Sequence, residues 1–167
     1  MPPGYVHAKH GFEPVYDRHS RILILGSFPS VKSRETSFYY GHPQNRFWKL
    51  LAALTGQDMP ETIEEKTRFL LENRIALWDV VEECDILGSS DLSIRNVIPN
   101  DINRILEKAP IEIICANGSE AFRLYKKYCK EKTNREAVKC PSTSPANAVW
   151  SLERLTEAWG KTLEGWL

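Results

Sequence analysis

Apolar runs of strand length alternate along this chain with segments of helical periodicity, and this alternation constrains the fold more than any other feature. The apolar runs are residues 21–27, 75–81, 111–117 and, shorter, 136–143. The helical patterns cover residues 45–55, 62–73, 101–108, 119–131 and 151–166, and Thr62 and Ser119 are the expected N-caps of two of them. The longest irregular stretch is residues 82–100, a candidate functional loop. Strands separated by helices are typical of a parallel sheet with crossover helices. The sequence therefore predicts the α/β class.

Composition bounds the class of protein further. The 167 residues, 42% of them hydrophobic, can form one core, so we expect a single domain over residues 1–167. The formal net charge is zero, so a nucleic-acid partner would be held by a local basic face. The chain has no apolar stretch of membrane-spanning length and no signal-peptide pattern, which predicts a cytoplasmic protein. The four cysteines form no CxxC pair, so we expect neither disulfides nor a metal.

Polar residues follow three of the predicted strands, and in open parallel sheets ligands bind beyond these strand ends. The first segment, Gly26–Pro29, combines a glycine that permits a tight turn with amides that can face a carbonyl or phosphate. The second contains Asn117, whose carboxamide suits the edge of a nucleobase. The third, residues 141–147, is rich in hydroxyl groups that can contact phosphate oxygens. Together they predict a binding site at one edge of the sheet.

Each of these segments also has an ordinary interpretation. Residues 26–29 can be a simple strand-to-helix loop, Asn117 with Gly118 can be turn chemistry, and residues 141–147 can be an unspecialised loop. The aromatic residues near Asn45 can all belong to the core; they are Tyr39, Tyr40, Phe47 and Trp48. Their coincidence at one predicted edge favours a pocket for a planar ligand.

Five segments of the chain resemble the uracil-DNA glycosylase superfamily, most closely its hypoxanthine-DNA glycosylase branch. They are GSFPS at 26–30, YYGHPQNRFW at 39–48, LWDV at 77–80, IRNVIPNDI at 94–102 and STSPAN at 142–147. The resemblance spans roughly residues 11–159. It implies a three-layer α/β/α sandwich with a four-stranded parallel sheet. It also implies a monofunctional glycosylase that flips a damaged base out of DNA and hydrolyses its N-glycosidic bond.

The resemblance implies a role for each matching position. Asn45 resembles the family's polar residue that orients the attacking water or bonds the base, and Ser27 is the second predicted catalytic residue. The predicted base-binding residues are Gly26, Phe28, Tyr40, Phe47 and Asn117. The predicted DNA-binding residues are Ser142, Thr143, Ser144, Pro145, Asn147 and Arg95. After the hydroxyl-rich loop, residues 148–150 occupy the place where relatives insert a wedge into the base stack, although Trp150 can equally be core.

The chain also departs from the family pattern. Phe28 stands where many uracil glycosylases carry Asp or Asn, and Ser142 stands where they often carry His. A general base within these motifs is therefore in doubt. The reaction permits this loss, because an oxocarbenium-like transition state depends strongly on stabilisation of the leaving base. The motifs contain no lysine, so a Schiff-base lyase is not expected.

Charged residues near the motifs have open roles. Asp79 and Asp91 are candidate site carboxylates, although Asp79 can instead cap a helix or pair with an arginine, and Asp101 is more simply a helix N-cap. His42 can face phosphate or packing. A basic rim for DNA can be formed by Arg46, Lys49, Arg95, Lys32 and Arg34.

Two interpretations from different classes remain. The first is a hydrolase, without cofactor and monomeric, that excises a deaminated base from double-stranded or single-stranded DNA at the nucleoid. Hypoxanthine from deoxyinosine is the implied substrate, with uracil and xanthine as further substrates and a mismatch-specific uracil glycosylase as the alternative. The second is a nucleic-acid or nucleotide binding module that kept the fold without catalysis. A dinucleotide enzyme is disfavoured, because the first loop lacks GxGxxG.

Overall fold

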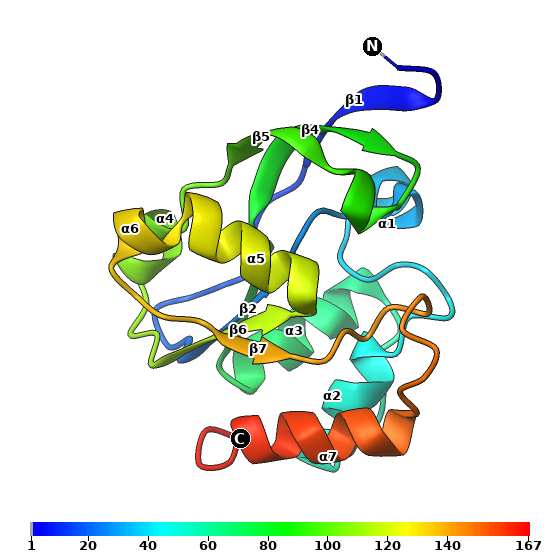
Figure 1. The fold of residues 1–167 in the computed structure, drawn as a ribbon. Helices are drawn as coiled ribbons and strands as arrows, with labels where there is room; N and C mark the ends of the chain where they lie inside the picture. The colour runs from blue at the N-terminus through cyan, green and yellow to red at the C-terminus, as the bar shows by residue number, and fades with distance from the viewer. Residues whose placement is uncertain (1) are drawn as a thin grey trace.

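The computed structural model describes residues 2–167 and contains a four-stranded parallel sheet at its centre (Figure 1). The strands are β2 (Ile22–Gly26), β3 (Ile75–Asp79), β6 (Ile113–Asn117) and β7 (Val138–Cys140), in the order β3-β2-β6-β7. Ile22 lies opposite both Ile75 and Ile113, which sets the register of the central strands. All residues of β2 and β3 are buried, as expected for parallel strands covered on both faces.

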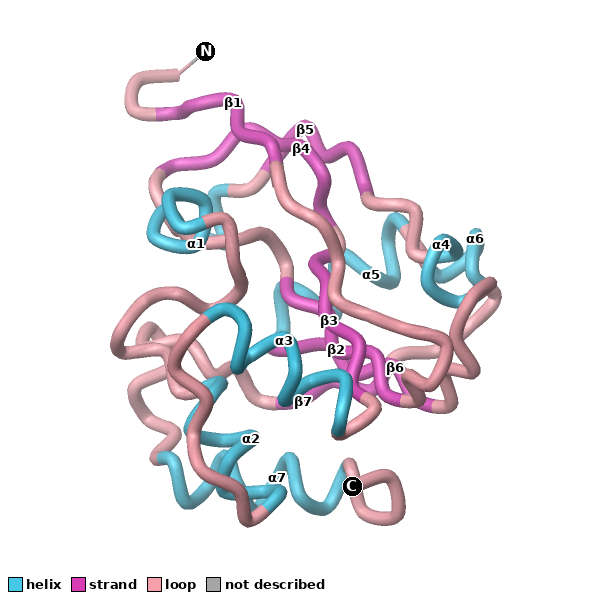
Figure 2. The backbone as a smooth tube through the Cα atoms, turned by 180° about the vertical axis from the view of Figure 1, so that it is seen from behind, coloured by secondary structure: helices cyan, strands magenta, loops and turns pink. Residues whose placement is uncertain are grey.

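Helices cover both faces of this sheet. They are α1 (Val31–Thr36), α2 (Phe47–Thr55), α3 (Ile63–Glu72), α4 (Asn103–Leu106), α5 (Ser119–Tyr128), α6 (Lys130–Thr133) and α7 (Leu152–Thr162). In the opposite views of Figures 1 and 2, α5 lies on one side of the sheet and α3 on the other. Helix α7 contacts β7 and α2. The predicted three-layer α/β/α sandwich is thus confirmed.

A second, antiparallel sheet was not predicted. It consists of β1 (Tyr5–Lys9), β4 (Val81–Leu87) and β5 (Arg95–Pro99), in the order β1-β4-β5, with a 3₁₀ turn, η1 (Asp91–Ser93), between the last two. The sequence suggested an irregular stretch over residues 82–100, which is wrong. The buried residues of β4, Val81, Cys84 and Ile86, are separated by exposed or half-buried acidic residues, and these acidic residues in VEECDIL obscured the strand.

The helix boundaries show which local signals were reliable. Thr62 caps α3 as predicted, because its hydroxyl accepts a hydrogen bond from the Glu65 amide. Ser119 is not an N-cap; Gly118 takes that position and Ser119 is the first helical residue. The predicted helix over residues 119–131 breaks at Cys129 into α5 and α6. Within residues 2–167, no helix combines the length and apolarity needed to cross a bilayer.

Candidate active site

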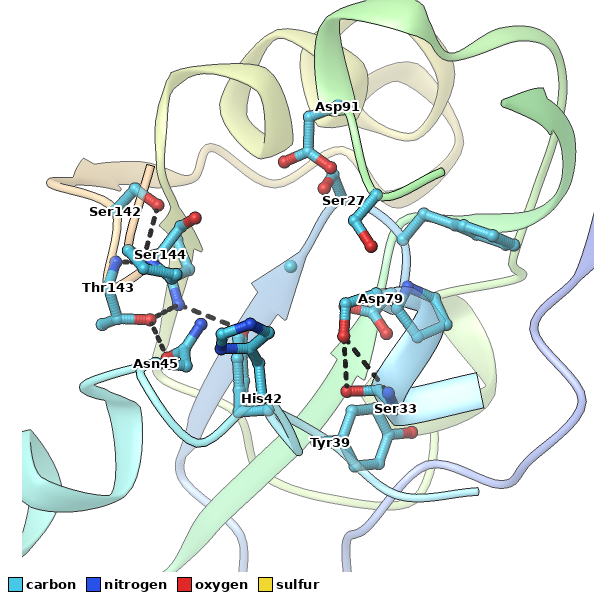
Figure 3. A pocket seen from close by; sticks show the side chains of 18 residues that line it. Ser27, Ser33, Tyr39, His42, Asn45, Asp79, Asp91, Ser142, Thr143 and Ser144 are labelled. Carbon is cyan, nitrogen blue, oxygen red and sulfur yellow. Dashed lines mark hydrogen bonds between the residues drawn. The ribbon is translucent and has the colours of Figure 1, made fainter. Parts of the chain in front are cut away.

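A cavity of about 150 Å³ opens where β2, β3 and β6 end (Figure 3). Its lining comes from the turn after β2, the segment before α2, the ends of β3 and β6, the loop before and into η1, and the loop after β7. Apolar cavities of this volume can hold a planar six-membered ring. The three strand-end segments singled out in the sequence therefore meet in one cavity of suitable size for such a ring.

Gly26 allows the floor of the cavity to close. A Cβ atom at this position would lie 2.3 Å from Oδ1 of Asp79 and 3.0 Å from the hydroxyl of Tyr40. Only a residue without a side chain lets these polar groups approach the end of β2 so closely. Gly26 thus allows close packing at the cavity floor and has no side chain with which to contact a ligand, so its predicted base-binding role is not one of side-chain contact.

Asn45 directs its amide nitrogen to the cavity. Its Oδ1 accepts a hydrogen bond from the Phe47 amide at 2.9 Å and another from the Thr143 hydroxyl at 2.8 Å. Because a backbone N–H can only donate, the atom facing Phe47 must be the oxygen. Asn45 lines the cavity, and its Nδ2 has no protein partner among residues 2–167. The side chain therefore presents a hydrogen-bond donor to any bound ligand.

Asn117 lies at the cavity, but its polar atoms are engaged within the protein. Its Nδ2 donates to the hydroxyls of Tyr40 at 3.1 Å and Thr143 at 3.0 Å, and its Oδ1 accepts from the Thr143 amide at 3.1 Å. Thr143 is fully buried, and its hydroxyl in turn donates a hydrogen bond to Asn45 Oδ1. Asn117 thus orients Thr143 and Asn45, while direct contact of Asn117 with a base stays a prediction.

Of the two aromatic residues expected to contact the base, Tyr40 lies at the cavity and Phe47 lies behind it. Tyr40 lines the cavity, and Phe47 stacks on the Tyr40 ring with centroids 4.0 Å apart and an interplanar angle of 21°. Phe47 is fully buried and is not a cavity-lining residue. The expected direct contact of Phe47 with a base is therefore corrected, because Phe47 is the first residue of α2 and packs into the core. Phe47 instead supports Tyr40, the aromatic residue that lines the cavity.

The hydroxyl-rich loop, residues 142–147, is organised by Arg46. The guanidinium donates to the carbonyl oxygens of Thr143, Ser144, Asn147 and Trp150. An arginine that binds backbone carbonyls in this way is a structural clamp, so its expected place in a DNA-contacting rim is corrected. Nothing in the local sequence marked this role, because the carbonyl groups that it binds lie about 100 residues further along the chain.

Side chains within the loop also shape it. Ser142 Oγ accepts from the Ser144 amide, Ser144 Oγ accepts from the Ala146 amide, and Asn147 Nδ2 donates to the Ser142 carbonyl. Ser142, Thr143, Ser144 and Pro145 line the cavity, whereas Asn147 does not. The serine hydroxyl hydrogens remain available for phosphate oxygens, which keeps DNA contact by this loop a prediction.

Asp79 faces the cavity floor and is paired with a histidine that the sequence did not indicate. His10 Nε2 lies 2.7 Å from Asp79 Oδ2, and His10 Nδ1 lies 3.0 Å from the Phe12 carbonyl. Both His10 and Asp79 are buried. The alternative of an arginine partner for Asp79 is therefore wrong, and the Asn100 side chain donates to the Asp79 carbonyl.

Asp91 reaches the cavity from η1, which lies more than 60 residues further along the chain than the motif after β2. It lies beside Ser27 (Figure 3). Burial raises the pKa of Asp91 to about 6, with the Ser27 side chain acting in the opposite direction. The cavity thus contains a second carboxylate, one from outside the motif in which Phe28 replaces the family's acid.

The remaining expected site residues lie apart or at the cavity wall. Phe28 is buried and lines the cavity, and the exposed His42 lines its rim. Arg95 lies on β5 with its guanidinium carbon 3.8 Å from the centre of the Tyr5 ring, away from the cavity lining. Val149 is 79% exposed, as a wedge residue would be. No group of three His, Cys, Asp or Glu residues within 2–167 is arranged to hold a metal ion.

Comparisons with known proteins agree with this geometry. The family description "Uracil DNA glycosylase superfamily" matches residues 13–163. A protein from Methanosarcina acetivorans named Hypoxanthine DNA glycosylase is 37% identical over 151 residues, which cover 89% of this chain and 94% of the relative. Its namesake from Methanosarcina barkeri is 36% identical over 115 residues, 68% of this chain and 73% of the relative.

A solved structure supports the same assignment. The solution NMR structure of a candidate uracil DNA glycosylase from Methanosarcina acetivorans superimposes with a TM-score of 0.81 at 35% identity. The match covers 96% of this chain and 99% of the other. With the family match over residues 13–163 and the cavity built from the motifs after β2, before α2 and after β7, the chain belongs to the uracil-DNA glycosylase superfamily.

Proposed function

We propose that this protein is a monofunctional DNA glycosylase that excises hypoxanthine from deoxyinosine in double-stranded DNA. The observation that carries the proposal is the donor at Asn45, whose amide orientation is fixed by Phe47 and Thr143 and whose free Nδ2 faces a cavity for a planar ring. The relatives named Hypoxanthine DNA glycosylase, at 36% and 37% identity, support the choice of substrate.

The cavity suits a flipped base in two ways. Tyr40, supported from behind by Phe47, offers a ring for stacking. Asn45 Nδ2 can donate a hydrogen bond to an acceptor atom of hypoxanthine, whose purine ring carries O6 and ring nitrogens. As the N-glycosidic bond breaks, its electron pair moves to the base, so a donor positioned there stabilises the transition state more than the ground state.

Hydrolysis without a covalent enzyme intermediate is consistent with the residues present. No lysine is found among the described residues that line the cavity, so a Schiff base with the sugar has no nucleophile there. The product would be an abasic site and a free base. The hydroxyl-rich loop, residues 142–147, would hold the DNA backbone while Val149 enters the space left by the flipped base.

The test is base excision from labelled duplexes that each contain one hypoxanthine, uracil, xanthine or normal base, followed by alkaline cleavage at abasic sites. We expect cleavage of the hypoxanthine duplex, and a loss of about 10²–10³-fold in the single-turnover rate for Asn45→Asp. This change keeps an acceptor for Phe47 and Thr143 but removes the donor. Asn45→Ala should lose activity at least as strongly.

Gln44→Ala is the matched control, because Gln44 is an exposed carboxamide beside Asn45 that does not line the cavity. It should excise hypoxanthine at the wild-type rate. Release of uracil alone would favour the mismatch-specific uracil glycosylase instead. Binding of the duplexes without any base release would contradict the enzyme and favour a binding module.

A further inference from the structure

We propose that Asp91 is the general base that accepts a proton from the water attacking the sugar, a role that rests on the glycosylase function proposed above. Asp91 lies at the cavity beside Ser27, and Figure 3 places it across the cavity from Asn45. A ligand in the cavity would therefore have a donor on one side and a carboxylate on the other. This arrangement supplies the acceptor that the motif around Phe28 lacks.

Asn45 cannot accept the water's proton through its carboxamide oxygen. That oxygen already accepts hydrogen bonds from the Phe47 amide and the Thr143 hydroxyl. The group that Asn45 presents to the cavity is an amide nitrogen, which donates and does not accept. A water molecule bound there would be oriented but not deprotonated, so the reaction needs a separate acceptor.

Asp79, the other carboxylate at the cavity, is less suited to this role. Its Oδ2 lies 2.7 Å from His10 Nε2, and both residues are buried. Its Oδ1 lies 2.3 Å from the position that a Cβ atom of Gly26 would take, against the strand end at the cavity floor. Asp79 is therefore committed to the contact between β3 and the segment containing His10. The Asp91 carboxylate, by contrast, forms no ion pair among residues 2–167, and the uncharged side chain of Ser27 lies beside it.

The turn that carries Asp91 is held at several points. The Ser93 carbonyl accepts a hydrogen bond from the Tyr5 hydroxyl at 3.0 Å, and the Ser89 hydroxyl accepts one from the Val31 amide at 2.9 Å. Ile94, directly after the turn, is buried in the core. The turn is thus fastened to β1 and to the start of α1, so the carboxylate has a defined position relative to the cavity, as a general base requires.

The surroundings of Asp91 favour proton acceptance near neutral pH. Burial, together with the charges of Asp79 and Glu120, raises the pKa of Asp91 to about 6, while Ser27 lowers it. The other titratable groups that line the cavity are His42 at its rim and the hydroxyls of Tyr39 and Tyr40, whose pKa values burial raises. At pH 7 to 8 the carboxylate is ionised yet more basic than an exposed aspartate.

The proposed step balances without a further reactant. The C1′–N9 bond breaks and its electron pair remains on hypoxanthine, while an oxygen–C1′ bond forms from the attacking water. The water's proton moves to the Asp91 carboxylate, which later releases it to the departing base or to solvent. The ionised carboxylate also stabilises positive charge that develops on the sugar.

The decisive variant is Asp91→Asn, which keeps the size of the side chain and removes its charge. Single-turnover excision of hypoxanthine from a duplex is measured from pH 4.5 to 8.5 for wild type and variant. We expect the wild-type rate to rise about tenfold per pH unit below about pH 6 and then level off. The variant should be slower by about 10²–10⁴-fold at pH 8 and lack this rise, while binding the uncleaved duplex with unchanged affinity.

Asp58→Asn, at an exposed aspartate outside the cavity, is the control and should match wild type. The Asp91 proposal is wrong, while the glycosylase function stands, if wild type excises hypoxanthine but the excision rate of Asp91→Asn is within about threefold of the wild-type rate. The same holds if the variant keeps the wild-type pH profile. If the variant instead loses inhibition by free hypoxanthine, Asp91 contacts the base and the proposal is also wrong. If wild type releases no base at any pH, the glycosylase function itself fails.

Discussion

Asn45 shows how a backbone group decides the chemistry of a side chain. The Phe47 amide lies two residues further along the chain and fixes the carboxamide oxygen at 2.9 Å, so the nitrogen is left for the cavity. The Thr143 hydroxyl donates a second hydrogen bond to the same oxygen. In the proposed function, a donor with so little rotational freedom meets the leaving base without reorganisation, which is the condition for strong electrostatic catalysis.

Asp91 should reduce the stability of the folded protein at neutral pH. Its pKa is about 6 in the folded chain against 3.8 for an unperturbed carboxyl, so the folded state binds the proton more tightly and stability falls as pH rises through this interval. We expect Asp91→Asn to change the free energy of unfolding little near pH 4 and to raise it by about 1–3 kcal/mol at pH 8. Urea unfolding at both pH values measures this, and equal effects at the two would contradict it.

Among the elements, the loop of residues 142–147 depends on contacts far away in the sequence. Arg46, directly before α2, binds carbonyl groups along the loop, and Asn117 at the end of β6 binds the Thr143 amide. Gly118 lets the loop approach, since a Cβ there would lie 3.0 Å from Ser142 Cβ and its φ is +99°. The loop is therefore shaped by α2 and β6 together.

Arg46→Lys should disrupt this loop even though it conserves the charge. A lysine ammonium cannot reproduce the planar set of donors, so several loop carbonyl groups lose their partner. We expect a loss of about 2–4 kcal/mol in the free energy of unfolding and weaker binding of a deoxyinosine duplex. Urea unfolding and fluorescence anisotropy measure the two effects. A variant as stable as wild type would show that the loop holds its shape without the clamp.

How far the sequence predicted these elements depends on the range of the interactions. The strands of the parallel sheet were predicted because each is a continuous apolar run, and the cavity was placed at their ends by topology. The strand Val81–Leu87 was missed because acidic residues interrupt its apolar ones, so that it lacks the continuous apolar run by which the other strands were predicted. The engagement of Asn117 and the clamp of Arg46 could not be predicted, since their partners lie 26 or more residues away.

At the scale of the whole molecule, the formal net charge of zero limits how DNA can be held. Of the five residues expected to form a basic rim, Arg46 binds the loop of residues 142–147, Arg34 donates to the Gly88 carbonyl, and Arg95 lies over Tyr5. Lys32 on α1 and Lys49 on α2 are exposed. These two lysines and the exposed Arg95, with backbone and hydroxyl groups of the loop, are the groups that we expect to contact phosphates.

DNA binding should therefore depend only weakly on salt. With about two to three phosphates neutralised, we expect log K to fall against log [salt] with a slope of about −2 to −3. Fluorescence anisotropy of a deoxyinosine duplex with the slow Asn45→Asp variant, between 50 and 300 mM salt, measures the slope. A slope of −6 or steeper would mean that many more cationic side chains reach the DNA.

The chain of hydrogen bonds from Asn117 through Thr143 to Asn45 joins the end of β6, the loop after β7 and the segment before α2. Exchange of any one residue leaves a partly or fully buried polar atom of its neighbour without a partner. A single substitution at any of the three positions is therefore destabilising unless the other two change with it. We expect the three to be inherited as a unit, so that lineages which abandon one of them replace the others as well and adopt a different way of breaking the glycosidic bond.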